Sequence, residues 1–151
     1  MYITNESNTL LSKSVVHTGD ILIVRDGSIG VSCVVPERFD GANVVSMIIM
    51  TVDKENDPHY MCYLLNSFIG KHQFELTKIG SALTHTSVGT VSNLQMLVPP
   101  LSEQKEIVKR LDIVISKIDR LIEIKQKKIV KLNEYKKSLI YEYVTGKKEV
   151  V

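Results

Sequence analysis

The chain of 151 residues has no tryptophan, only two cysteines and no long hydrophobic run. Its longest mostly apolar stretch, Val44–Val52, is too short to cross a bilayer. The first residues lack the basic start and apolar core of an export signal, so we expect a cytoplasmic protein. Cys33 and Cys62 lie in apolar surroundings without Cys-x-x-Cys spacing, which favours buried free thiols over a disulfide.

Signatures of catalysis are also missing. The segment Asp26–Gly30 superficially suggests a phosphate cradle, but it lacks the Gly-x-Gly-x-x-Gly pattern, a Gly-Lys-Ser/Thr motif and a following helix. His59, Cys62 and His72 could meet beside one helix as zinc ligands, yet Cys62 is expected on its apolar face and hence in the core. No local signature places Ser or Cys beside His and an orienting acid. We predict no enzyme and no metal site.

Charge is distributed unevenly, although the net charge is only +2. Residues 1–100 contain six basic and nine acidic side chains, whereas residues 101–151 contain thirteen basic and eight acidic ones. A protein that binds nucleic acid by itself usually has a basic surface on its globular part. The globular part of this chain has no such excess of basic side chains.

The first hundred residues are α/β (α+β) in character. Two β-runs, Ile21–Val24 and Val31–Val35, are joined through Asp26-Gly27, a strong hairpin signal because both residues tolerate positive φ. A third run, Asn43–Val52, hardly alternates, which predicts a strand buried on both faces. Further expected elements are a polar loop over Lys78–Gly89 and a short strand over Gln95–Val98.

One helix is expected inside this block. Asp57 is a good N-cap, and Pro58 suits the first helical position. Gly70 or the residues just after it are expected to end the helix. The residues at core spacing are Met61, Leu64, Leu65 and Phe68.

A proline pair, Pro99-Pro100, marks a boundary, because proline cannot continue a strand ladder and disfavours helix in the residue before it. No glycine or proline follows until Gly146, and Ser102 is a good N-cap. We predict a mixed α/β domain over 1–98, a proline-rich junction over 99–101, a coiled-coil helix over 102–145 and a tail over 146–151. About 43 helical residues would extend about 64 Å.

Two neighbouring apolar stripes run along that helix, and Lys125 and Lys128 interrupt the first of them. A single helix would leave both in water, so a partner helix is expected. From periodicity alone, a generic coiled-coil dimerisation arm remains an alternative. The residues of the expected dimer or partner interface are Ile107, Leu111, Val114, Ile115, Ile118, Leu121, Ile122, Ile129, Leu132, Tyr135, Leu139 and Tyr143.

Particular motifs add to this pattern. "PPLSEQKEIVKRLD" and "IDRLIEIKQKKIVKLNEYKKSLIYEYVTGK" closely resemble the conserved region of type I restriction-modification specificity subunits. "GDILIVRDGSIG" and "GSALTHTSVG" are similar to motifs of that family's target recognition domains. The matching positions of the conserved region are Pro99, Pro100, Leu101, Glu103, Gln104, Ile107, Leu111, Ile118, Asp119, Leu121, Ile129, Leu132, Lys136, Ser138, Leu139, Ile140, Val144, Thr145, Gly146 and Lys147.

The resemblance implies a non-catalytic subunit that reads half of a bipartite DNA target. It implies double-stranded DNA, methyltransferase subunits and restriction subunits as partners, with S-adenosylmethionine, ATP and Mg only on the partner subunits. Only eighteen residues precede the Gly-Asp-Ile-Leu-Ile motif, fewer than is usual in the family. We therefore expect a truncated half-subunit with one recognition domain and one conserved-region helix, which forms a homodimer through an antiparallel helix pair and reads a palindromic split site.

Two segments are candidates for reading bases. One is the hydroxyl-rich loop, where short donors and acceptors could reach groove edges and a lysine could contact phosphate. The other is the hairpin tip, where arginine could grip guanine or phosphate, with Asp26 beside it. The simpler alternatives are an ordinary polar loop and a solvated turn with an Arg–Asp pair. The candidate residues are Lys78, Ser81, Thr84, His85 and Thr86 in the loop, and Arg25 and Ser28 in the hairpin.

A second class of function stays open beside DNA recognition. The chain could be a dimerising coiled-coil scaffold, or an inactive truncated specificity subunit without DNA recognition of its own.

Overall fold

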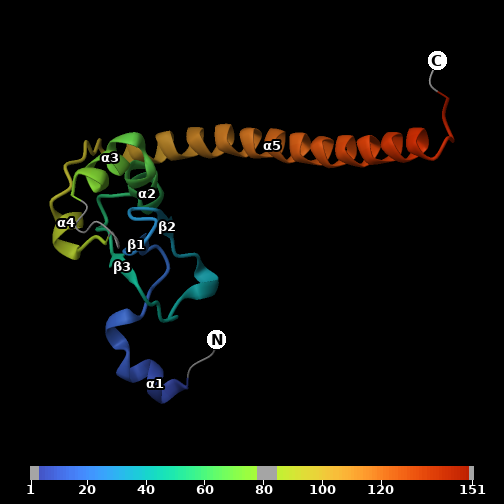
Figure 1. The fold of residues 1–151 in the computed structure, drawn as a ribbon. Helices are drawn as coiled ribbons and strands as arrows, with labels where there is room; N and C mark the ends of the chain where they lie inside the picture. Colours follow the sequence, from blue (N-terminus) through green and yellow to red (C-terminus); the bar gives the residue numbers. More distant parts are fainter. Residues whose placement is uncertain (1–3, 78–84, 150–151) are drawn as a thin grey trace. The chain divides into compact units, whose positions relative to one another are not determined.

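The computed structural model describes residues 4–77 and 85–149, and its chain forms two compact units, Met1–Val108 and Lys109–Val151. No helix within the described ranges has the length and hydrophobicity needed to cross a membrane. In chain order (Figure 1) the elements are α1 (Asn5–Leu10), η1 (Ser12–Ser14), β1 (Ile21–Val24), β2 (Ser32–Val34), η2 (Glu37–Phe39), β3 (Met47–Met50), α2 (Pro58–Asn66), α3 (Phe68–Leu76), α4 (Val88–Ser92) and α5 (Leu101–Val144).

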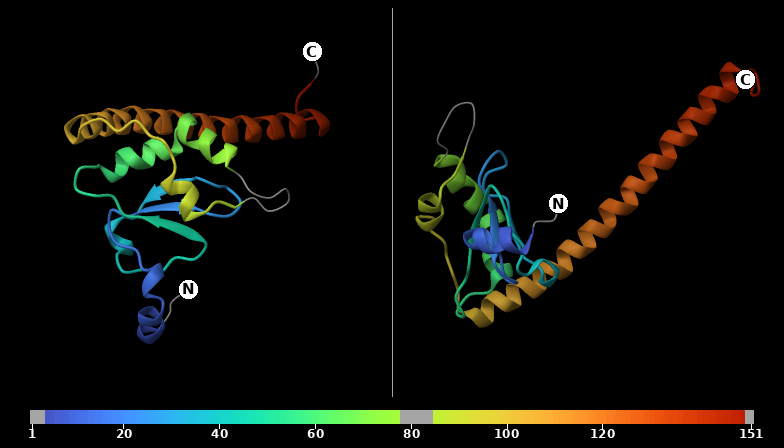
Figure 2. Two further views of the ribbon diagram at one scale, coloured as in Figure 1. Left: turned by 90° about the vertical axis from the view of Figure 1, so that its left-hand side faces the viewer. Right: turned by 90° about the horizontal axis from the view of Figure 1, so that it is seen from below.

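The three strands form an antiparallel sheet with the order β2-β1-β3, so the predicted hairpin and the α/β (α+β) class are confirmed. In this register Leu22 lies between Cys33 and Ile49. The expectation that the third strand is buried on both faces is wrong, because β3 is a short edge strand. Ile48 is buried, whereas Met47 is 38% exposed. Helices α2 and α3 lie on one face of the sheet (Figure 2).

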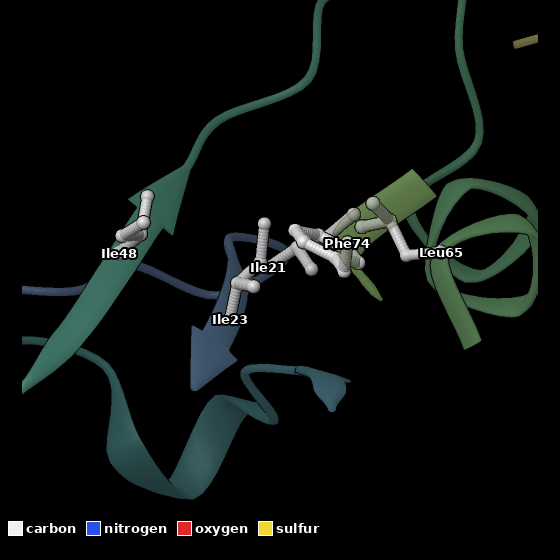
Figure 3. Close-up of a cluster of buried hydrophobic side chains, with 5 residues drawn as sticks. All are labelled: Ile21, Ile23, Ile48, Leu65 and Phe74. Carbon is white, nitrogen blue, oxygen red and sulfur yellow. The ribbon is translucent and has the colours of Figure 1, made fainter. Parts of the chain in front are cut away.

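The core lies between that sheet face and the two helices. Ile21 and Ile23 of β1 and Ile48 of β3 meet Leu65 of α2 and Phe74 of α3 (Figure 3). All five side chains are at most 5% exposed. Burying one such side chain contributes about 1.5–3 kcal/mol, so this small cluster supplies much of the stabilisation of the first unit.

Helix α2 begins as predicted. The Asp57 carboxylate accepts hydrogen bonds from the N–H groups of His59 at 2.9 Å and Tyr60 at 3.1 Å. Pro58 occupies the first turn, where its missing N–H costs nothing. The N-cap prediction is therefore confirmed by its geometry.

The predicted end of this helix is wrong. Helix α2 stops at Asn66, and Ser67 is both its C-cap and the N-cap of α3. Gly70 lies inside α3, where a Cβ atom would come within 2.3 Å of the Leu65 carbonyl oxygen. The glycine thus permits two helices to approach closely rather than ending one of them. Phe68, expected in the core, is 83% exposed because it begins the second helix.

The segment from residue 85 to the proline pair also differs from expectation. Helix α4 begins at Val88, inside the predicted loop, and extends beyond it to Ser92, and the Ser87 hydroxyl caps this helix by accepting from Thr90 N–H at 3.1 Å. The strand expected over Gln95–Val98 does not form. Instead the Gln73 side chain bonds the Gln95 main chain, donating to its carbonyl at 2.9 Å and accepting from its N–H at 2.8 Å. A side-chain amide thus takes the place of a neighbouring strand.

Both cysteines are free, but only one is shielded. Cys33 is exposed, so the expectation of a buried thiol is wrong for this residue. In the sheet it is paired with Leu22, and both residues lie on the face that α2 and α3 do not cover. Cys62 is partly buried, and its thiol contacts the Ser32 carbonyl at 3.4 Å. Burial raises the pKa of the Cys62 thiol, so it stays protonated at neutral pH.

Two carboxylates organise the chain around β1. Buried Asp20 accepts from the N–H of His17 and from the hydroxyl of Thr51, each at 2.7 Å, and so ties the approach to β1 to the end of β3. Exposed Asp40 accepts from Thr18 N–H at 2.8 Å. This backbone hydrogen bond lowers the pKa of Asp40, because it favours the charged form.

The long helix α5 contains 44 residues, about 66 Å of helix. It starts at Leu101, so the prediction of Ser102 as N-cap is wrong, and Ser102 lies inside the first turn. The Pro100 carbonyl accepts from two N–H groups of that turn. The end is confirmed: Gly146 has φ +70° and its N–H donates to the Tyr143 carbonyl, as expected for a left-handed C-terminal residue.

Buried Gln104 ties the first turn of α5 to the segment that precedes α2. Its Oε1 accepts from Asp57 N–H at 2.8 Å. Its Nε2 lies 2.8 Å from the Pro99 carbonyl oxygen, 3.1 Å from Asn56 Oδ1 and 3.4 Å from the Glu55 carbonyl oxygen. With 1% of its surface exposed, the side chain has its hydrogen-bonding capacity satisfied almost entirely by protein.

Candidate nucleic-acid interface

The turn between β1 and β2 is shaped by two glycines with positive φ, Gly27 at +81° and Gly30 at +79°. An added Cβ on Gly30 would lie 2.3 Å from the Phe74 ring, so the base of the turn rests directly on the core. Gly27, by contrast, has open space around it. The tip of the hairpin is therefore anchored at its base and exposed at its end.

The structure brings the two predicted candidate segments together. The N–H of Thr86 donates to the Arg25 carbonyl at 3.0 Å, and Asp26 and His85 form an antiparallel bridge. The N–H of Arg25 donates to the Ser46 carbonyl at 3.4 Å. The main chain of Arg25 is therefore held on both sides, by the segment before β3 and by the segment before α4.

The two joined candidate segments line a surface hollow of about 610 Å³. Arg25, Asp26, His85 and Thr86 contribute to its wall, and β3 contributes apolar side chains. Lys13 of η1 lines it too, although the sequence gives no local signal for this residue, because only the fold brings the N-terminal segment here. A concave surface with three basic side chains and hydrogen-bonding groups can contact a nucleic acid.

The polar groups of the hollow differ in their exposure and in their hydrogen bonds. Arg25 Nε lies 3.2 Å from Asp26 Oδ2, and both side chains are about half exposed. His85 is exposed. Thr86 is 4% exposed, and its hydroxyl has no hydrogen-bond partner within the described residues. A buried hydroxyl without a partner is costly and is a candidate contact for a ligand.

The remaining predicted residues fall elsewhere. Ser28 is exposed at the hairpin tip and its carbonyl accepts from Val31 N–H, but it does not line the hollow. Lys78, Ser81 and Thr84 lie outside the described residues. Across the two described ranges, no group of three His, Cys, Asp or Glu side chains could hold a metal ion.

The predicted interface residues of α5 lie along most of its length. Ile107, Leu111, Ile115 and Leu139 are partly buried, and Leu121, Leu132 and Tyr135 are 55–61% exposed. The others are also exposed: Val114, Ile118, Ile122, Ile129 and Tyr143. Large apolar side chains in this number are a feature of surfaces that bind a partner.

Comparison with known proteins gives consistent matches. A family model described as the type I restriction modification DNA specificity domain matches residues 3–134. The chain is 29% identical over 133 residues to the type I restriction enzyme MjaVIII specificity subunit of Methanocaldococcus jannaschii, over 87% of this chain and 29% of that protein. It is 30% identical over 104 residues to a putative type I restriction enzyme MjaX specificity subunit of the same organism, over 67% of this chain and 23% of that protein.

The fold matches as well. The crystal structure of the HsdS subunit from Thermoanaerobacter tengcongensis superposes with a TM-score of 0.62 and 19% sequence identity, over 71% of this chain and 28% of that chain. The chain thus spans less than a third of the length of each of these relatives.

Proposed function

Because the chain belongs to the family of type I restriction modification DNA specificity domains, we propose that it selects the DNA sequence on which a type I restriction-modification enzyme acts. It reads one half of a bipartite target and docks methyltransferase and restriction subunits. Those subunits carry out the chemistry with S-adenosylmethionine, ATP and Mg, and this chain is not a catalyst.

One observation carries the proposal that the first unit reads DNA. The hairpin tip and the segment before α4, each a base-reading candidate by its own sequence, line a single hollow and are joined by main-chain contacts. Recognition of DNA needs phosphate contacts that fix the register and base contacts that specify sequence. Lys13 and His85 are suited to phosphate, whereas the fixed Arg25–Asp26 pair is suited to base edges.

The proposal is tested by mapping methylated adenines in a genome that carries the gene, with and without its deletion. We expect a split motif to disappear on deletion, and the purified chain to bind duplexes containing that motif more tightly than scrambled duplexes at physiological salt. An unchanged methylation map, together with binding that depends only on salt and not on sequence, would refute the proposal.

The exposed stripes of α5 support pairing of two copies through antiparallel helices. Two-fold symmetry would then separate two reading units and favour a palindromic split target. The helix length sets an upper limit of roughly two turns of DNA between half-sites, at about 34–36 Å per turn. Pairing of two α5 helices would cover one of the two apolar stripes. The second stripe would then be free to bind side chains of a methyltransferase subunit.

Pairing is tested with charged substitutions on α5 and light scattering. We expect the wild type to be a dimer and the double variant Leu121→Glu/Leu132→Glu to be a monomer, because burying two carboxylates in the seam is costly. The matched control, Ser116→Glu/Ser138→Glu, adds the same charge near the opposite side of the helix and should remain a dimer. A monomeric wild type, or equal behaviour of both variants, would overturn the pairing.

A second candidate function is a dimerising scaffold without DNA recognition. The observation that favours it is the same exposed apolar surface of α5, which needs no DNA-reading unit to find a partner. The two candidates are distinguished by the methylation map: a scaffold retains the dimer and leaves the map unchanged.

A further inference from the structure

The hairpin tip carries Arg25, whose guanidinium group is held by a single hydrogen bond to the neighbouring Asp26 carboxylate. Asp26 engages Arg25 through Nε at 3.2 Å. Within the part of the chain that the structure describes, the two Nη groups of Arg25 have no hydrogen-bond partner, and its side chain is half exposed. A guanidinium held at Nε can offer its Nη groups as a bidentate donor edge.

The main chain beneath this side chain is also constrained. Its N–H is bonded to Ser46 and its carbonyl to Thr86, so the Cα position of Arg25 is fixed by two segments that are distant in sequence. Gly30 anchors the base of the hairpin against Phe74. The donor edge is thus preorganised, which lowers the entropy that a base contact would cost.

We infer that Arg25 reads a guanine at one fixed position of the half-site, donating from its guanidinium to N7 and O6 in the major groove, while Asp26 acts as its positioning residue. This inference rests on the proposed function. A bidentate arginine–guanine pair is the commonest specific contact to a base edge.

The charge of the pair favours a base over a phosphate. The Asp26 carboxylate lies beside the guanidinium and would repel a phosphate oxygen at the same place. It has no such conflict with a base edge, where it can accept from the amino group of a neighbouring cytosine or adenine. Lys13, which lines the same hollow, is the better phosphate contact.

The experiment uses the full chain and duplexes that carry the motif found in the methylation map. Each guanine of the motif is replaced in turn by another base and by 7-deazaguanine, which lacks the N7 acceptor. For the wild type we expect one guanine whose replacement by another base weakens binding about 5- to 150-fold, and whose 7-deaza form binds more weakly as well. Arg25→Ala should be nearly indifferent to both changes at that position.

Two further variants separate base reading from general effects. Arg38→Ala removes the same charge from a side chain that lies over the Phe39 ring, outside the hollow, and should retain the guanine preference. Asp26→Ala should bind scrambled DNA more tightly, because a negative charge is lost, while its guanine preference falls. These opposite changes are not expected from unfolding, which would lower both quantities.

The outcomes distinguish the two proposals. A wild type that binds a split motif but shows the same guanine preference after Arg25→Ala would overturn this inference and leave the proposed function intact. A wild type without any preferred motif would refute the proposed function and this inference with it. A preference lost in Arg25→Ala and retained in Arg38→Ala would support the inference.

Discussion

Replacing Gln104 by methionine removes the polar clamp of the first turn of α5 while nearly preserving side-chain length. Two hydrogen bonds of 2.8 Å are lost, each contributing about 1 kcal/mol net. The N–H of Asp57 and the carbonyl of Pro99 then lose their partners, which adds up to about 2 kcal/mol, depending on how far water reaches these half-buried groups. The free energy of unfolding of the first unit should fall by about 2–4 kcal/mol, a large part of the roughly 5–15 kcal/mol that is usual for a domain.

The loss of stability is measured by hydrogen exchange of the amide groups of β1, which belong to the first unit and not to α5. Exchange limited by unfolding of the first unit should accelerate about 30- to 900-fold, since each 1.36 kcal/mol is a factor of ten. Ser102→Ala is the control on the same turn, and because Ser102 is not the N-cap its effect should stay within about 0.5 kcal/mol. An unchanged exchange rate in Gln104→Met would refute the assignment of the clamp.

Three further predictions concern the first unit. Gly30→Ala should lower its stability by about 2–4 kcal/mol in urea denaturation, because φ is positive and the new Cβ would collide with the Phe74 ring; stability equal to wild type would contradict the close packing. In the native protein Cys33 should react rapidly with a thiol reagent and Cys62 only on unfolding, because burial raises the pKa of the Cys62 thiol; equal rates would argue against this. The lowered pKa of Asp40 means that it stabilises the fold at neutral pH and that this contribution is lost as the pH falls through its folded-state pKa; the stability difference between wild type and Asp40→Asn should therefore shrink on acidification, and a constant difference would count against it.

Local features were predictable because a few neighbouring residues specify them. The hairpin follows from Asp26-Gly27 between β-branched runs, and the start of α2 follows from Asp57 and Pro58. The extent of α5 followed to within a residue from the proline pair and Gly146, since no helix breaker lies between them. The apolar stripes follow from the helical period of the same segment, although Lys125 and Lys128 interrupt the first of them.

Features that depend on distant partners were not predictable. Gly70 reads locally as a helix end, yet close contact with the end of α2 places it inside a second helix. The Gln95–Val98 segment has the residues of a strand, but Gln73 satisfies its backbone in place of a neighbouring strand. In both places tertiary contacts override local propensity.

The sequence by itself determined the elements whose caps, turns and periodicity are local, and it marked two separate polar segments as candidate DNA contacts. Only the tertiary structure decided that the Arg25 and His85 segments meet at one hollow, that Lys13 joins them, and that Gln104 is buried beside Asp57. The physical reason is that turns and caps depend on the φ/ψ preferences of adjacent residues. A shared surface depends instead on which distant segments the packing of Ile21, Ile23 and Phe74 brings together.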